Sequence, residues 1–196
     1  MTQDEEIRSL LLREIENARA KQRERDDHGW DISPYRDLKI LQIDSRGLVG
    51  ENFVVAALAA VGKEVKHYDR TDREQEKQWD IFCDGIRLEV KIATMGRVSP
   101  TFQHENLDKN RAFDGIIFID VAPEAVYVSF VPKFLVPWSK IHRRKDSTYY
   151  KWDFRRADLE ENGRRVETLE DFRRGYEAML AEIRRHREER GPVEDR

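Results

Sequence analysis

The segment QWDIFCDGIRLEVKIAT, at residues 78–94, places two carboxylates and an ammonium group among apolar side chains. These charged residues are Asp80, Glu89 and Lys91. Carboxylate oxygens from neighbouring strands suit a hard divalent cation such as Mg²⁺. The segment therefore has the residue types of a cation site, provided that the chain brings the three side chains together.

A tight turn in the middle of this segment predicts how the charged residues meet. The dipeptide Asp-Gly at 84–85 is typical of a two-residue type I′ turn between antiparallel strands. In the register of such a hairpin Asp80 lies directly opposite Glu89, and Lys91 follows on the same face. Opposed Cβ atoms are about 4.5–5.5 Å apart, so the like charges need a cation between them. The other face is predicted to be core and carries Ile81, Cys83, Ile86, Leu88, Val90 and Ile92.

A second interpretation of the hairpin is a sheet face in water that carries an ordinary cross-strand pair of Glu89 and Lys91. Antiparallel strands with one wet face commonly show this pattern. A register shift of one residue would also move the whole charged set to the other face. The hairpin alone thus leaves a solvated ion pair and a cation site as alternatives.

The elements around the hairpin are predicted from periodicity and composition. The pattern predicts helices at about 4–25, 49–61, 103–110 and 169–190. Apolar runs predict strands at 63–70, 115–121 and 125–132, beside the hairpin. No regular element is predicted for 133–154. The predicted fold class is α/β, with a mixed central β-sheet flanked by helices, in a single domain over residues 1–196.

Composition narrows the classes of protein. Charged residues make up 38% of the chain, and no apolar run approaches the roughly 18 residues of a membrane span. The single cysteine, Cys83, excludes an intramolecular disulfide and a Cys-rich zinc site, and it fits a cytoplasmic location. The N-terminus lacks the apolar core of a signal peptide. The net charge of −3 means that nucleic-acid binding would depend on local basic clusters.

Basic residues gather in the C-terminal half, where Tyr149, Tyr150 and Trp152 lie among them. Basic and aromatic side chains together can hold a phosphate backbone and stack bases. Charge runs are also typical of solvated surface, and the aromatics could form a packed loop instead. The residues predicted to bind nucleic acid are Arg143, Arg144, Lys145, Lys151, Arg155 and Arg156.

The order of charged residues resembles the signature of the PD-(D/E)XK nuclease superfamily. Asp80 in "WD" and the "EVK" of residues 89–91 match the Asp and the Glu-x-Lys of that motif, although Trp79 stands in place of its proline. Glu51 on the preceding helix and Gln103 after the lysine resemble further positions around the superfamily's site. The resemblance covers a nuclease core at about 46–131. It leaves out the N-terminal helix at about 4–25 and a C-terminal helical region at about 150–190.

This resemblance implies a restriction-endonuclease-like core and Mg²⁺-dependent hydrolysis of DNA phosphodiester bonds, with Mn²⁺ as a substitute. Asp80, Glu89, Glu51 and the Val90 carbonyl would hold the metal. Lys91 would orient or help to deprotonate the attacking water. Gln103 would support Lys91 or contact the DNA backbone.

Within this resemblance, a restriction-type enzyme that acts as a homodimer is the expected function, because two subunits can cut both strands. A structure-selective nuclease of the Holliday-junction-resolvase kind is an alternative. A non-catalytic nucleic-acid-binding protein of the same fold and an unrelated α/β protein are the others.

Overall fold

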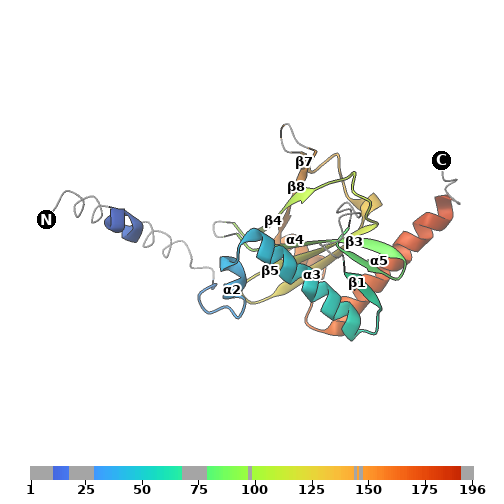
Figure 1. Cartoon of the computed structure of the whole chain (residues 1–196), viewed down its shortest axis with the longest axis horizontal. Coiled ribbons are helices and arrows are strands. Elements are labelled where there is room, and N and C mark those ends of the chain that lie inside the picture. Colours follow the sequence, from blue (N-terminus) through green and yellow to red (C-terminus); the bar gives the residue numbers. More distant parts are fainter. Residues whose placement is uncertain are drawn as a thin grey trace.

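The computed structural model describes residues 11–17, 29–67, 79–96, 99–143, 145 and 148–190. Its main sheet has five strands in the order β1-β2-β3-β5-β6. Figure 1 labels β1, β3 and β5 of this sheet. The strands are β1 (Val65–His67), β2 (Ile81–Cys83), β3 (Ile86–Thr94), β5 (Gly115–Val121) and β6 (Val126–Pro132). β3 and β5 run parallel and the other neighbours antiparallel, so the predicted mixed sheet is confirmed.

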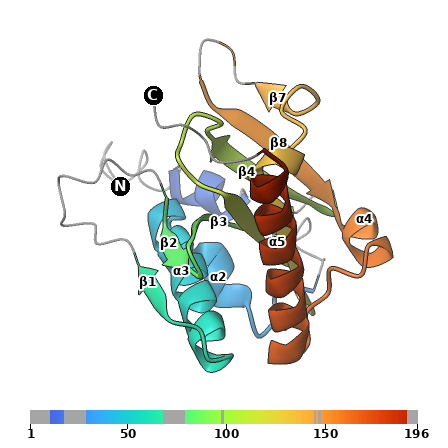
Figure 2. The same cartoon turned by 90° about the vertical axis from the view of Figure 1, so that its right-hand side faces the viewer.

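Helices cover one face of the main sheet and a second sheet covers the other (Figure 2). The long helices on the first face are α3 (Ile43–Ala60) and α5 (Leu169–Arg190). The second sheet has the order β4-β8-β7 and consists of β4 (Thr101–Leu107), β8 (Tyr150–Arg155) and β7 (His142–Arg143). The short helices are α2 (Arg36–Ile40), η1 (Lys133–Leu135) and α4 (Arg156–Glu161). None of the helices described is long and apolar enough to span a membrane.

Strand β5 lies between these layers, which explains its continuous apolar sequence. All seven of its residues are buried, as predicted for a strand covered on both faces. Ile117 and Ile119 face the helices, and Phe118 faces the second sheet, where its ring lies 4.9 Å from that of Phe154. Helix α3 approaches closely because Gly50 has no side chain. A Cβ atom there would lie 3.0 Å from Ile92.

The hairpin forms around the predicted turn. Asp84 and Gly85 have φ of 50° and 80°, and Cys83 pairs with Ile86, as a type I′ turn requires. The next pairs, Phe82 with Arg87 and Ile81 with Leu88, match the predicted register, and regular strand pairing ends there. Asp80 lies before β2, and its N–H donates to the Leu88 carbonyl at 2.9 Å. The predicted strand pair of Asp80 with Glu89 is therefore not formed.

The second sheet is the main error of the sequence-based prediction. The helix expected at 103–110 is strand β4, and the start of the C-terminal helical region at 150 is strand β8. Burial alternates along most of β4, with Phe102 and His104 inside and Gln103 outside, which is a strand pattern. Helix α3 begins at 43, earlier than predicted, and α5 follows its predicted range. Of the predicted N-terminal helix, residues 11–17 are helical and the others lie outside the described residues.

Candidate active site

Glu89 and Lys91 lie on β3, in the middle of the main sheet, and their side chains face the second sheet. Alternation along β3 places them there, because Val90 points into the core beneath the helices. On β5 their neighbours are Ile116 and Phe118, which belong to the core between the two sheets. The predicted charged face exists, but another layer of the protein covers it.

Glu89 is buried, with 2% of its surface exposed. This burial rules out the alternative of a sheet face in water. Glu89 Oε1 forms an ion pair with Lys91 Nζ at 2.7 Å and accepts a hydrogen bond from Arg111 Nη1. Its other oxygen, Oε2, is buried and has no hydrogen-bond partner among the residues that the structure describes. Because a buried carboxylate oxygen without a partner is costly in free energy, Oε2 marks a position where a ligand could bind.

Asp80 reaches the same place from the residue before β2. Its Oδ2 accepts a hydrogen bond from the Val90 N–H at 2.7 Å. Burial, and after it the charge of Glu89, raises the pKa of Asp80 from 3.8 to about 6. The Val90 hydrogen bond and the cations Lys91 and Arg111 act in the opposite direction. Two carboxylates thus share a buried site in which Asp80 is readily protonated.

Arg111 links the two carboxylates and is the site residue that sequence reasoning missed. Its Nη2 lies 3.7 Å from Asp80 Oδ1, while its Nη1 contacts Glu89. It lies in the polar segment before β5 and has no local sequence signal. Parallel pairing of β5 with β3 brings the segment to the carboxylates. Asp80, Glu89, Lys91 and Arg111 are called the charged cluster below.

The donor atoms of the charged cluster partly fit a divalent cation. Asp80 and Glu89 supply carboxylate oxygens, and Glu89 Oε2 is unsatisfied. Across the described ranges, no group of three or more His, Cys, Asp or Glu side chains is arranged to hold a metal ion. Mg²⁺ commonly keeps several waters and takes one or two protein carboxylates, so two carboxylates are a sufficient protein contribution.

Glu51, predicted as a further metal ligand, has another partner in the structure. Its Oε2 lies 3.0 Å from His67 Nε2 on β1. His67 pairs in the sheet with Ile81, the residue after Asp80, so Glu51 lies toward the same end of the hairpin. It does not form a three-carboxylate metal group with Asp80 and Glu89 among the described residues. Its predicted metal role stays a prediction.

Gln103 lies on β4 with its side chain exposed. The neighbouring His104 points inward and lies 2.8 Å from Asp120 Oδ1 on β5, so Gln103 faces away from the main sheet. This orientation gives no support to the predicted contact with Lys91. A contact with the DNA backbone stays a prediction. His104 and Asp120 are both buried, and burial raises the pKa of Asp120 against the influence of the histidine.

Arg155 and Arg156 lie where β8 ends, beside Thr101 at the start of β4. Arg155 donates two hydrogen bonds to Asp158, at 2.8 and 2.6 Å. Arg156 donates to Glu160 at 2.9 Å and also pairs with a glutamate in the β5–β6 turn. These two arginines are thus near the end of β5, whereas the charged cluster is beside its first half. Their contact with DNA stays a prediction.

The other predicted DNA-binding residues lie on and around β7 and β8. Arg143 and Lys145 are exposed, and Arg144 lies outside the described residues. Lys151 Nζ is 3.6 Å from Asp153 Oδ1 on the same strand. No described contact joins these side chains to the charged cluster, so their role also stays a prediction.

Two of the aromatic residues among them are packing residues. The Tyr150 ring lies 5.3 Å from that of Trp138, and the Trp152 ring lies 5.5 Å from that of Phe118. Both help to build the core between the sheets. Tyr149 is exposed. The structure therefore supports the interpretation of packed aromatics for Tyr150 and Trp152.

The raised pKa of Asp80 leads to a stability prediction. Protonated Asp80 favours the folded state. Its contribution to the free energy of unfolding is complete below pH 3.8, which is the pKa of the unfolded state. The contribution is lost as the pH rises through about 6, which is the pKa in the folded protein. Asp80→Asn carries no charge and still accepts the Val90 hydrogen bond. In EDTA at about pH 8, we expect it to raise the free energy of unfolding by on the order of 2 kcal/mol. Urea unfolding at about pH 8 and about pH 4 tests this, and an equal gain at both pH values would contradict it.

Comparison with known proteins gives no family for this chain. No protein-family model matches it, and no curated protein matches it. A solved structure of a bacterial homing endonuclease aligns with 73% of this chain and 97% of its own, at 12% identity and a TM-score of 0.44. A TM-score this low does not establish a common fold, and neither activity nor metal is transferred from that protein to this chain.

Proposed function

We propose that this protein is a Mg²⁺-dependent endonuclease that hydrolyses DNA phosphodiester bonds, and that residues of about 46–131 form its restriction-endonuclease-like core. The observation that carries the proposal is the buried Glu89 with one unsatisfied oxygen, next to Asp80, Lys91 and Arg111. A solvated ion pair gives no reason to bury these groups together. A site that binds a cation and an anionic substrate does give a reason for burying them, because the cation and the substrate neutralise each other's charge.

The residues of the charged cluster would divide the work of hydrolysis. Asp80 and Glu89 would hold the cation with the Val90 carbonyl, and Mn²⁺ would replace Mg²⁺. The bound cation would lower the pKa of water and screen the phosphate. Lys91 would orient the attacking water, help it to lose a proton to bulk water, and stabilise negative charge on the scissile phosphate. The water oxygen would bond to phosphorus as the bond to O3′ breaks, and O3′ would take up a proton from solvent, which leaves a 5′-phosphate and a 3′-hydroxyl.

Arg111 gains a role that the sequence did not suggest. In the present structure it neutralises Glu89, and a cation between the carboxylates would take over that function. The guanidinium would then be available for the phosphate oxygens, for which its planar set of donors is suited. We therefore assign Arg111 to binding of the scissile phosphate.

A restriction-type homodimer is the finer form of this proposal, and a structure-selective nuclease is the alternative. The deciding experiment is cleavage of plasmid and phage DNA with Mg²⁺ or Mn²⁺, beside an EDTA control. Discrete bands would identify a sequence-specific enzyme, and cleavage of branched DNA alone would favour the alternative. If no DNA is cleaved, the nuclease proposal is wrong and a binding protein takes its place.

Metal binding is expected to depend on pH in a direction set by Asp80. Protons compete with the metal below the pKa of about 6, so affinity should fall about tenfold for each pH unit below it. We expect millimolar Mg²⁺ to raise Tm clearly at about pH 8 and little at about pH 5. Asp80→Asn should show no such rise at either pH. An undiminished rise at the lower pH would show that Asp80 is not a ligand.

A further inference from the structure

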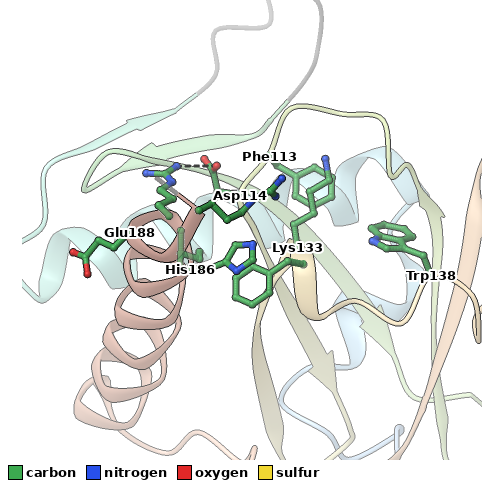
Figure 3. A pocket seen from close by; sticks show the side chains of 10 residues that line it. Phe113, Asp114, Lys133, Trp138, His186 and Glu188 are labelled. Atoms are coloured by element: carbon green, nitrogen blue, oxygen red, sulfur yellow. Dashed lines mark ion pairs between the residues drawn. The ribbon is translucent and has the colours of Figure 1, made fainter. Parts of the chain in front are cut away.

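A cavity of about 890 Å³ lies between the last turns of α5 and the short helix η1 (Figure 3). Its volume is within the roughly 300–1,000 Å³ typical of small-ligand sites. Aromatic side chains and cations line it together. The lining residues on which the inference depends are Phe113, Lys133, Phe134, Trp138, His186 and Arg190.

One lining residue links this cavity to the charged cluster. Lys133 Nζ donates a hydrogen bond to the backbone carbonyl of Arg111, whose guanidinium contacts Glu89. Phe113 and Asp114 follow Arg111 closely in the chain and line the cavity. This link through the Arg111 backbone is the structural basis for placing a group in the cavity on the same DNA strand as a phosphate at Arg111.

The aromatic wall offers flat surfaces for stacking. The rings of Phe134 and His186 are stacked, with centroids 3.9 Å apart and an angle of 15° between their planes. Phe134 is 39% exposed, so part of its ring is accessible. Trp138 lies on another side of the same cavity (Figure 3). Aromatic surfaces of this kind bind bases of any sequence, because every base has a π-face.

The charges around the cavity favour an anion. Asp114 is neutralised by Arg187 Nη2 at 2.8 Å and by Arg87 Nε on β3 at 3.3 Å. Lys133 and Arg190 are further basic residues in the lining, and Glu188 is the other carboxylate. Burial lowers the pKa of Lys133 from its ordinary value. Within the described residues, Arg190 forms no ion pair, so its charge can meet a phosphate.

We propose that this cavity receives one unpaired nucleotide of the DNA strand next to the scissile phosphate. The base lies against Phe134 and Trp138, and the phosphate lies near Lys133 and Arg190. A base inside a duplex has both faces covered, so it reaches a concave aromatic pocket only when it is unpaired or flipped out. The inference rests on the proposed nuclease function and deepens it, since it names DNA with an unpaired nucleotide as the preferred substrate. It thereby favours the structure-selective form of that function over the restriction-type form.

The test compares two fluorescent DNA duplexes in EDTA by anisotropy, one fully paired and one with a single bulged nucleotide. We expect the protein to bind the bulged duplex more tightly. Phe134→Leu should lower that preference by about tenfold, whereas Phe134→Tyr should retain it. Arg190→Ala, at an exposed position, should weaken binding of the bulged duplex as an independent check. Arg185→Ala, which removes an ion pair with Glu182 outside the cavity, should match the parent protein.

Three results would overturn the inference: no binding of either duplex, equal binding of both, or an unchanged preference in Phe134→Leu and Arg190→Ala. Thermal unfolding of each variant shows that the comparison is between folded proteins. Cleavage with Mg²⁺ is measured separately. Cleavage without a pocket-dependent preference would support the nuclease function and contradict the nucleotide site in the cavity. A pocket-dependent preference without cleavage would support the nucleotide site and contradict the nuclease function.

Discussion

Replacement of Lys91 by alanine is expected to reduce Mg²⁺-dependent DNA cleavage by about a thousandfold. Lys91 Nζ lies 2.7 Å from Glu89 Oε1 on the same strand, and in the proposed reaction it would act on the attacking water and the phosphate. A positioned group that takes part in proton transfer contributes about 10²–10⁴ to a rate. Initial rates on plasmid DNA, measured with parent and variant at matched concentration, give the ratio directly.

The fold should tolerate the loss of Lys91, because Arg111 continues to neutralise Glu89. DNA binding in EDTA should therefore be close to that of the parent. Lys66→Ala is the matched control, since Lys66 lies exposed on β1 of the same sheet. We expect this control to cleave normally. Equal cleavage by Lys91→Ala and Lys66→Ala would show that Lys91 has no role in the reaction.

Replacement of Glu89 by alanine is expected to abolish cleavage and also to destabilise the protein. The substitution leaves Lys91 and Arg111 close together without the carboxylate that both contact. Breaking a buried ion pair from one side costs about 3–5 kcal/mol. At about 2–4 °C per kcal/mol for a chain of this size, a loss of about 3 kcal/mol lowers Tm by roughly 6–12 °C. Thermal unfolding by circular dichroism measures this change.

Glu89→Gln separates the two roles of this residue. The amide keeps the volume and a hydrogen-bond acceptor, so the fall in Tm should be smaller than for Glu89→Ala. The negative charge is lost, so millimolar Mg²⁺ should no longer raise Tm at about pH 8. If Mg²⁺ stabilises Glu89→Gln as much as the parent, Glu89 is a structural ion-pair residue and the metal binds elsewhere.

Local sequence determined the hairpin and the strands of the main sheet. The Asp-Gly turn fixes the register because both residues need positive φ, which few other dipeptides adopt readily. Alternation along 86–92 then places Glu89 and Lys91 on one face. The continuous apolar run of β5 and the helical stripe of α5 are equally local signals, and both elements lie where they were predicted.

Tertiary structure alone decided how the charged face is used. The second sheet pairs β4 with β8, about fifty residues apart, and neither strand has a pattern strong enough to indicate the partnership. Its packing buries Glu89, which alternation by itself could not do. The chain turn before β2 replaces the predicted strand pair with a hydrogen bond from Val90 to Asp80. Parallel pairing of β5 with β3 brings Arg111 to both carboxylates.

The sequence by itself thus determined which residue types share the hairpin, because turn geometry and strand alternation depend on neighbouring residues. Burial, pKa and the identity of the counter-cation depend on groups far away in the chain, and only the folded layers set them. The raised pKa of Asp80 and the unsatisfied oxygen of Glu89 are of this second kind.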